Sequence, residues 1–270
     1  METAIPFFRE QGSGAGVVCL HSNASSSGQW RALSDLLSDR FNVIAVDGYG
    51  AGKSPQWPAG PALRLEDEVR LLEPALTRAG DRFHLVGHSY GAAVAVKAAL
   101  MHPHRVKSMI LYEPTLFHLV AGADPLTSPA QGIWRAATDA AAAIDQGDGP
   151  AAAERFIDFW MGAGSWQAMP AARQAGIASA TGNVRAWRDT LFNETFAPSA
   201  LAALDLPVLL QTGERSPESS LSVARALQGL LPKLTAVALE GVGHMGPITH
   251  PKEVNALIRS FLDRNECLSR

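Results

Sequence analysis

Cysteine is scarce in this sequence, which has only Cys19 and Cys267 in 270 residues. The two lie near opposite ends of the chain, so they form neither a disulfide framework nor the close spacing of a zinc site. Nothing else in the sequence indicates a metal or a cofactor, and we predict neither. Few cysteines and no disulfide framework are typical of a protein of the reducing cytoplasm, which is the location we predict.

Long apolar runs and an excess of positive charge are also lacking. No run approaches the roughly 18 to 20 apolar residues that a membrane span needs. Residues 1–6 lack the basic and apolar regions of a signal peptide. Basic side chains number 23 against 26 acidic ones, giving a net charge of −3, which is poorly suited to nucleic acid or anionic membranes. We therefore expect a small-molecule substrate, no nucleic acid partner and no membrane span; the oligomeric state stays open.

Apolar runs alternate with amphipathic patterns along the first part of the chain, and hydrophobic residues make up 47% of it, enough for a sizeable core. This alternation predicts an α/β fold with a mostly parallel central sheet and helices on both faces. The predicted strands are 5–10, 16–20, 42–46, 83–88 and 106–111, with helices from residue 29, over 63–79 and over 90–101.

The alternation stops between about residues 116 and 203. This stretch is helical in composition and contains four of the six tryptophans, and its Phe156, Phe159 and Trp160 fall on one helical face. These aromatic side chains either pack the inserted helices together or line a pocket. Strands at 207–211 and 234–239 and helices at 218–230 and 251–262 follow. We predict a core of residues 1–115 and 204–270, with 116–203 inserted as a helical cap.

The pentapeptide Gly-His-Ser-Tyr-Gly at 87–91 lies between an apolar run and a run of small apolar residues. Strand, sharp turn and helix is the arrangement that this pattern predicts. Gly87 and Gly91 lack the β-carbons that would collide in such a turn. The turn would hold the Ser89 hydroxyl above a helix N-terminus, where the Tyr90 N–H can bind an oxyanion.

Residues 47–54 superficially resemble a phosphate-binding loop, because they end in Gly-Lys-Ser. The pattern requires glycine at the position of Asp47, and a carboxylate there would repel a phosphate. Pro55 disfavours a long helix starting at Lys53. Nucleotide binding is therefore not expected.

The elbow at 87–91, the loop at 47–54, the inserted helical segment and a late Gly-His at 243–244 occur in an order that resembles the α/β-hydrolase family, over about residues 7–262. The resemblance implies Ser89 as nucleophile and His244, among eight histidines, as its base. It implies an oxyanion hole made by the Tyr90 N–H and a second N–H in the loop after the first central strand. We expect Asn23 to supply the second, and Ser22 stays possible.

The third member of the triad departs from the family pattern. Its usual aspartate position falls on Ser216, three residues after Gly213, and a hydroxyl cannot stabilise an imidazolium as a carboxylate does. Some members carry the acid after the preceding strand, where this chain has Glu113. The sequence favours Glu113, with Glu214 as the alternative acid and an acid-free dyad as a third possibility.

A serine at the nucleophile position argues against a dehalogenase or an epoxide hydrolase, because those enzymes need a carboxylate there. We therefore predict a serine hydrolase that cleaves a small or medium apolar ester, thioester or lactone through an acyl-enzyme on Ser89. Two alternatives stay open. One is a carbon–carbon bond hydrolase that uses the same triad, and the other is a ligand-sensing protein of the same fold without turnover.

Overall fold

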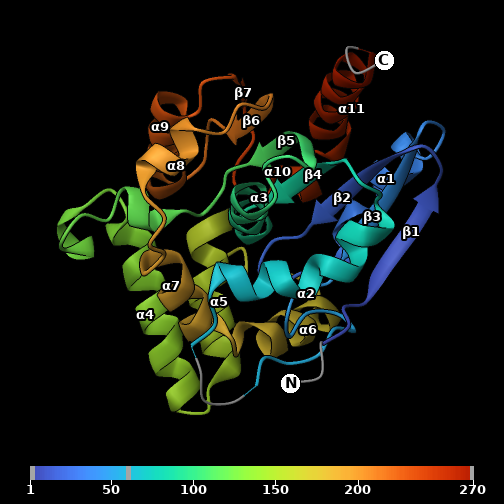
Figure 1. Cartoon of the computed structure of the whole chain (residues 1–270). Coiled ribbons are helices and arrows are strands. Elements are labelled where there is room, and N and C mark those ends of the chain that lie inside the picture. Colours follow the sequence, from blue (N-terminus) through green and yellow to red (C-terminus); the bar gives the residue numbers. More distant parts are fainter. Residues whose placement is uncertain (1–3, 59–61, 268–270) are drawn as a thin grey trace.

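The computed structural model describes residues 4–58 and 62–267 (Figure 1), so residues 1–3, 59–61 and 268–270 of the predicted core lie outside it. The described residues form one seven-stranded sheet of order β1-β3-β2-β4-β5-β6-β7. β1 pairs antiparallel with β3, and every other pair is parallel. The strands are β1 (Phe8–Gly12), β2 (Ala15–Leu20), β3 (Phe41–Val46), β4 (Phe83–His88), β5 (Val106–Tyr112), β6 (Val208–Gly213) and β7 (Leu234–Leu239).

Both faces of the sheet are covered, which explains why its central strands are continuous apolar runs. β2 sends Val18 and Leu20 into one core cluster, and Val17 and Cys19 into the other. Helices α2, α3 and α9 pack on the first face, and α1 and α11 on the second. These flanking elements are η1 (Ser27–Trp30), α1 (Arg31–Leu37), α2 (Leu65–Arg78), α3 (Tyr90–Met101), α9 (Glu218–Leu230), α10 (Gly246–Thr249) and α11 (Pro251–Cys267).

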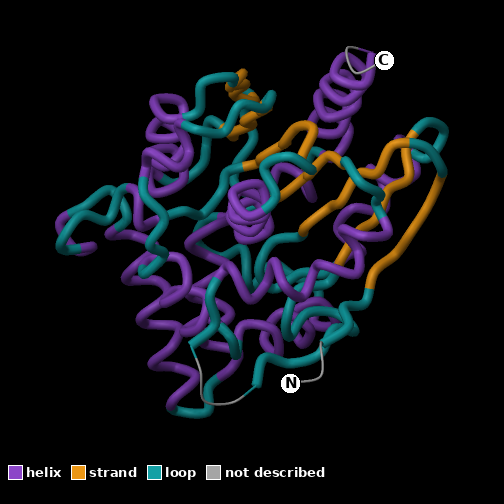
Figure 2. Tube along the Cα trace, viewed as in Figure 1, coloured by secondary structure: helices purple, strands orange, loops and turns teal. Residues whose placement is uncertain are grey.

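The chain between β5 and β6 contains helices and no strand, and all of it lies within the described residues. Figure 2 shows these helices gathered to one side of the strands. α4 packs against α5 and α7, and α5 against α6. The elements are η2 (Phe117–Leu119), η3 (Pro125–Thr127), α4 (Gln131–Asp145), α5 (Gly149–Met161), α6 (Ala171–Thr181), α7 (Val184–Phe192) and α8 (Pro198–Ala202). None of the described helices is long and apolar enough to cross a membrane.

Several element boundaries differ from the sequence-based prediction, most of all those of β1 and α11. β1 runs from Phe8 through Gly12 instead of 5–10, because its backbone pairs with β3 as far as Asn42. α11 continues to Cys267 instead of 262. Its apolar stripe ends at Leu262, but Asn265 donates from its side chain to the Phe261 carbonyl one turn earlier.

The loop at 47–54 is organised by hydrogen bonds to the carboxylate of Asp47, its first residue. The buried carboxylate of Asp47 accepts hydrogen bonds from the N–H groups of Ser27 at 2.5 Å and Lys53 at 2.9 Å. A β-carbon on Gly52, which has a φ of 53°, would lie 2.0 Å from Asp47 Oδ2. The glycine is therefore required by the carboxylate beside it, and turns rather than a helix follow it.

A buried polar cluster ties α11 to the sheet. The fully buried ring of His84 contacts Ser108 Oγ at 2.7 Å and Glu266 Oε1 at 2.7 Å, and Lys107 also pairs with Glu266. Burial raises the pKa of Glu266, but hydrogen bonds from Lys107 and His84 outweigh burial and bring that pKa below its usual value. The ionised carboxylate is thus the form that the fold favours.

We expect Glu266→Ala to lower the free energy of unfolding at pH 7 by about 1–3 kcal/mol, because it leaves a buried ring nitrogen of His84 unpaired. A carboxyl whose pKa is lowered by folding stabilises the fold above its unfolded pKa and loses that effect as the pH falls through its folded pKa. The difference from the wild type should therefore shrink below about pH 4.5. Urea denaturation at pH 7 and pH 4 measures it. Lys252→Ala, an exposed site on the same helix, is the control, and an equal loss there would contradict the assignment.

Candidate active site

The turn between β4 and α3 holds Ser89 in a strained backbone conformation, with φ 56° and ψ −116°. A β-carbon on Gly87 would lie 2.5 Å from Ala92 Cα, and one on Gly91 would lie 2.3 Å from the Leu20 carbonyl oxygen. Both glycines are therefore required by the closeness of the neighbouring backbone. The turn places the Ser89 hydroxyl at the N-terminus of α3, as the pentapeptide predicts.

Three side chains from distant parts of the chain form one hydrogen-bonded series. Ser89 Oγ lies 2.9 Å from His244 Nε2, and His244 Nδ1 lies 2.6 Å from Glu113 Oε2. An ionised carboxylate only accepts, so Nδ1–H donates to Glu113 and the unprotonated Nε2 accepts from the Ser89 hydroxyl. The exposed fractions of Ser89, His244 and Glu113 are 5%, 2% and 0%. The structure thus brings the predicted nucleophile, base and favoured acid together, shielded from water.

The carboxylate of Glu113 is held from its other side as well. Its Oε1 accepts from the Gly213 N–H at 2.7 Å and from the Ser216 hydroxyl at 2.5 Å. Glu113 has a positive φ of 45°, which is unusual for a residue other than glycine. Ser216, which stands where the family resemblance places an aspartate, therefore donates to the same Glu113 carboxylate that contacts His244.

Glu214 is not brought to the imidazole. Its side chain is exposed, and its Oε2 accepts a 3.4 Å hydrogen bond from the Gly241 N–H. Of the two carboxylates that the sequence offers, only Glu113 contacts His244.

The loop after β2 distinguishes between the two candidates for the second oxyanion donor. The Ser22 N–H donates to Gln29 Oε1 at 3.1 Å. Within residues 4–58 and 62–267, the N–H groups of Asn23 and Tyr90 have no protein acceptor. The Ser22 N–H is thus occupied, while those of Asn23 and Tyr90 are available to a ligand.

His21 shapes this loop and does not contact Ser89. The Gly48 N–H donates to His21 Nε2 at 3.1 Å, so Nδ1 carries the ring proton and donates to the Ser22 carbonyl at 2.7 Å. Burial lowers the pKa of His21, which keeps the ring neutral.

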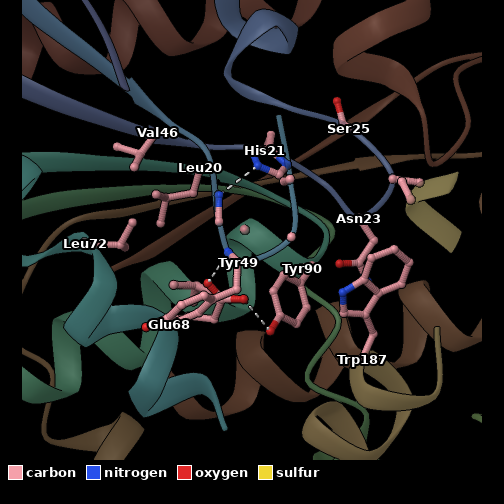
Figure 3. Close-up of a pocket in the computed structure, with 17 residues that line it drawn as sticks. Leu20, His21, Asn23, Ser25, Val46, Tyr49, Glu68, Leu72, Tyr90 and Trp187 are labelled. Atoms are coloured by element: carbon pink, nitrogen blue, oxygen red, sulfur yellow. Dashed lines mark hydrogen bonds between the residues drawn. The ribbon is translucent and has the colours of Figure 1, made fainter. Parts of the chain in front are cut away.

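A narrow cavity of about 30 Å³, room for only one or two water molecules, lies beside the loop (Figure 3). Asn23 and Tyr90 both line it. The rest of its wall is mainly apolar and includes Leu20, Val46, Leu72, Val94 and Trp187.

Glu68 is a buried acid in this cavity that the sequence analysis missed. It accepts from the Tyr90 hydroxyl at 3.1 Å and from the Tyr49 N–H at 3.2 Å. Burial raises the pKa of Glu68 to about 7. A signal was present in the sequence, because Glu68 falls on the apolar face of its helix between Leu65 and Leu72.

Two wider clefts adjoin the site and share Met161 and Met245 as lining residues. One, of about 650 Å³, reaches from Asn23 to Arg173 on α6. The other, of about 370 Å³, is lined by His244, Trp160 and Arg215. The site therefore communicates with the surface between the sheet loops and the inserted helices.

Comparison with known proteins agrees with this fold. The model of the alpha/beta hydrolase family matches residues 17–257. A pimeloyl-[acyl-carrier protein] methyl ester esterase of Aliivibrio fischeri is 23% identical, over 96% of this chain and 98% of that one. A probable lysophospholipase of Arabidopsis thaliana, BODYGUARD 2, is 31% identical, but the match covers 40% of this chain and only 24% of the relative's length.

Solved structures show the same architecture. The α/β hydrolase MGS-M2, from a deep-sea metagenome, superposes with a TM-score of 0.78 at 20% identity, over 96% of this chain and 94% of that one. The enol-lactonase of Burkholderia xenovorans gives 0.77 at 18% identity, with 96% of both chains covered. Fold and family together define a hydrolase of the α/β type, which confirms the predicted fold class and resemblance. The chain belongs to the alpha/beta hydrolase family.

Proposed function

We propose that this protein is a serine hydrolase that cleaves a small or medium apolar ester, thioester or lactone through an acyl-enzyme on Ser89. The observation that carries the proposal is the hydrogen-bonded series from Ser89 Oγ through His244 to Glu113. A serine hydroxyl needs a base to become a nucleophile at neutral pH, and an oriented imidazole is such a base.

The reaction has two halves. Ser89 Oγ attacks the carbonyl carbon while His244 Nε2 takes its proton, and His244 then gives that proton to the departing alcohol or thiol. Water next attacks the acyl-enzyme with the same base, releasing the acid and restoring Ser89. The N–H groups of Tyr90 and Asn23 hold the oxyanion in both halves. Glu113 fixes the imidazole tautomer and stabilises the imidazolium.

Residues 116–203 form a cap over this site in our proposal, with 1–115 and 204–270 as the core. Two contacts support it. Trp160 of α5 lies against His244, and Trp187 of α7 lines the narrow cavity.

The apolar wall of the cavity supports an apolar group on the substrate. The names of similar proteins, a pimeloyl-[acyl-carrier protein] methyl ester esterase and an enol-lactonase, support an ester or a lactone. The sensor alternative relied on the missing acid at position 216, and the contact between Glu113 and His244 removes that support. The carbon–carbon alternative uses the same residues and is addressed in the Discussion.

Fluorophosphonate labelling tests the proposal without a known substrate, because only an activated serine reacts quickly with this probe. We expect rapid labelling of the wild type at one site, mapped by mass spectrometry to the peptide that contains Ser89, and none of Ser89→Ala. Labelling of the folded wild type no faster than Ser89→Ala would favour a sensor.

A further inference from the structure

Trp160 stacks face to face on His244. The two ring centroids are 3.8 Å apart and the ring planes differ by 22°. Both side chains are buried, with exposed fractions of 8% for Trp160 and 2% for His244. The indole therefore covers one face of the imidazole, while Ser89 and Glu113 engage its two nitrogens.

The inserted segment holds this indole in place. Trp160 lies in the last turn of α5, which ends at Met161 and is followed by Gly162 with a φ of 98°. Phe159 and Phe156 contact the indole edge-on, at centroid distances of 4.8 and 6.2 Å. Asp158 accepts from the N–H groups of Gly164 and Trp166 and so fixes the chain that follows the helix. The ring therefore presents its face to His244 from an element that belongs to neither the sheet nor its loops.

The charges around His244 give this contact a chemical consequence. Glu113 supplies a negative charge at Nδ1. The His88 ring lies 5.3 Å away and is neutral, because burial lowers the pKa of His88 well below its usual value. Arg215 lines the adjacent cleft with an exposed side chain. The indole face carries the negative lobe of a quadrupole, which attracts a cation held against it, more strongly where water is excluded.

We propose that Trp160 is a positioning residue that stabilises the protonated form of His244 during acyl transfer. This inference rests on the proposed function, in which the imidazole carries a positive charge at the transition state. The neutral imidazole gains less from the indole face than the imidazolium does, so the contact favours the transition state over the resting enzyme. Because Trp160 comes from α5, proton transfer depends on where that helix lies.

Fluorinated tryptophans inserted at position 160 alone test the proposal. Fluorine withdraws electron density from the indole and weakens the negative potential of its face, with little change of shape. The readout is the second-order rate of fluorophosphonate labelling of Ser89 as a function of pH. Each added fluorine should slow labelling on the alkaline plateau, by about three- to tenfold for 5,6,7-trifluorotryptophan. The midpoint of the acid limb should move to lower pH across the series, since the imidazolium is less stable. A change in packing alone gives no such graded pair of effects.

The same substitution at Trp166, a buried residue in a separate cluster, is the matched control. It should change neither the labelling rate on the alkaline plateau nor the midpoint of the acid limb. Trp160→Phe should retain more of the labelling rate than Trp160→Leu, since phenylalanine keeps an aromatic face. Unchanged plateau and midpoint throughout the fluorinated series would overturn the inference and leave the serine hydrolase proposal intact. A wild type that does not label would instead overturn the proposed function, and this inference with it.

Discussion

Glu113→Gln is expected to lower kcat on a p-nitrophenyl ester by about 10³- to 10⁴-fold, the loss typical when a triad carboxylate becomes an amide. A glutamine carries no negative charge for the imidazolium, and its NH₂ group can donate to Nδ1 and stabilise the wrong tautomer of His244. Steady-state kinetics measure the loss. A circular dichroism spectrum equal to that of the wild type shows that the variant is folded.

Glu214→Gln is the matched control, because it makes the same change on an exposed side chain that contacts Gly241 and not His244. Its kcat should stay within about twofold of the wild type. The opposite pattern, with a large loss only in Glu214→Gln, would show that the acid has been assigned wrongly. Equal small losses in both variants would favour an acid-free dyad.

A double variant that moves the carboxylate from position 113 to position 216 also tests the assignment of the acid. Glu113→Gly suits the positive φ at this position, and Ser216→Asp places a carboxylate where the family usually carries it. The kcat of the double variant should be at least tenfold higher than that of Glu113→Gly alone. If the kcat of a folded double variant is no higher than that of Glu113→Gly, a carboxylate at position 216 does not reach the imidazole of His244.

Ser89→Ala should lower kcat on esters and thioesters by about 10⁶-fold, as removal of a catalytic serine does in comparable triads. Without the hydroxyl no acyl-enzyme forms, and only binding and the oxyanion donors still act. Ser220→Ala is the control, because it removes a second buried hydroxyl beside the imidazole, one that lies 3.4 Å from Nδ1 of His244 and not at Nε2. Its activity should fall less than tenfold.

The same variant addresses the carbon–carbon alternative. If Ser89→Ala loses ester hydrolysis but still cleaves a bond beside a ketone in a diketone, a base-catalysed mechanism without an acyl-enzyme is favoured. Loss of both activities supports nucleophilic attack by Ser89.

The helices and strands were largely predictable from sequence because their signals are local. Three of the site residues, Ser89, His244 and Glu113, were also named from sequence. A strand buried on both faces is a short apolar run, and a sharp elbow needs glycines at fixed positions, as Gly87 and Gly91 show. Glu113 was predictable as a contact of His244 because carboxyl ends of parallel strands share one edge of the sheet, and it directly follows β5.

The remaining features depend on contacts that have no local signal. The sequence favoured Asn23 over Ser22 without excluding Ser22, because the difference lies in the Gln29 side chain, which occupies the Ser22 N–H. The stripe that contains Trp160 was visible as a helical pattern, but the face that it presents depends on how α5 packs. Ser216 could be recognised as a missing acid, whereas its hydrogen bond to Glu113 needs the folded loop.

Trapping of the acyl-enzyme tests the central claim most directly. The wild type is mixed with excess p-nitrophenyl ester, quenched in acid within the first turnover and analysed by intact mass and peptide mapping. We predict a burst of about one p-nitrophenolate per active site, and one acyl group on the peptide that contains Ser89. Steady turnover without a burst, together with an acyl group on any residue other than Ser89, would contradict the account.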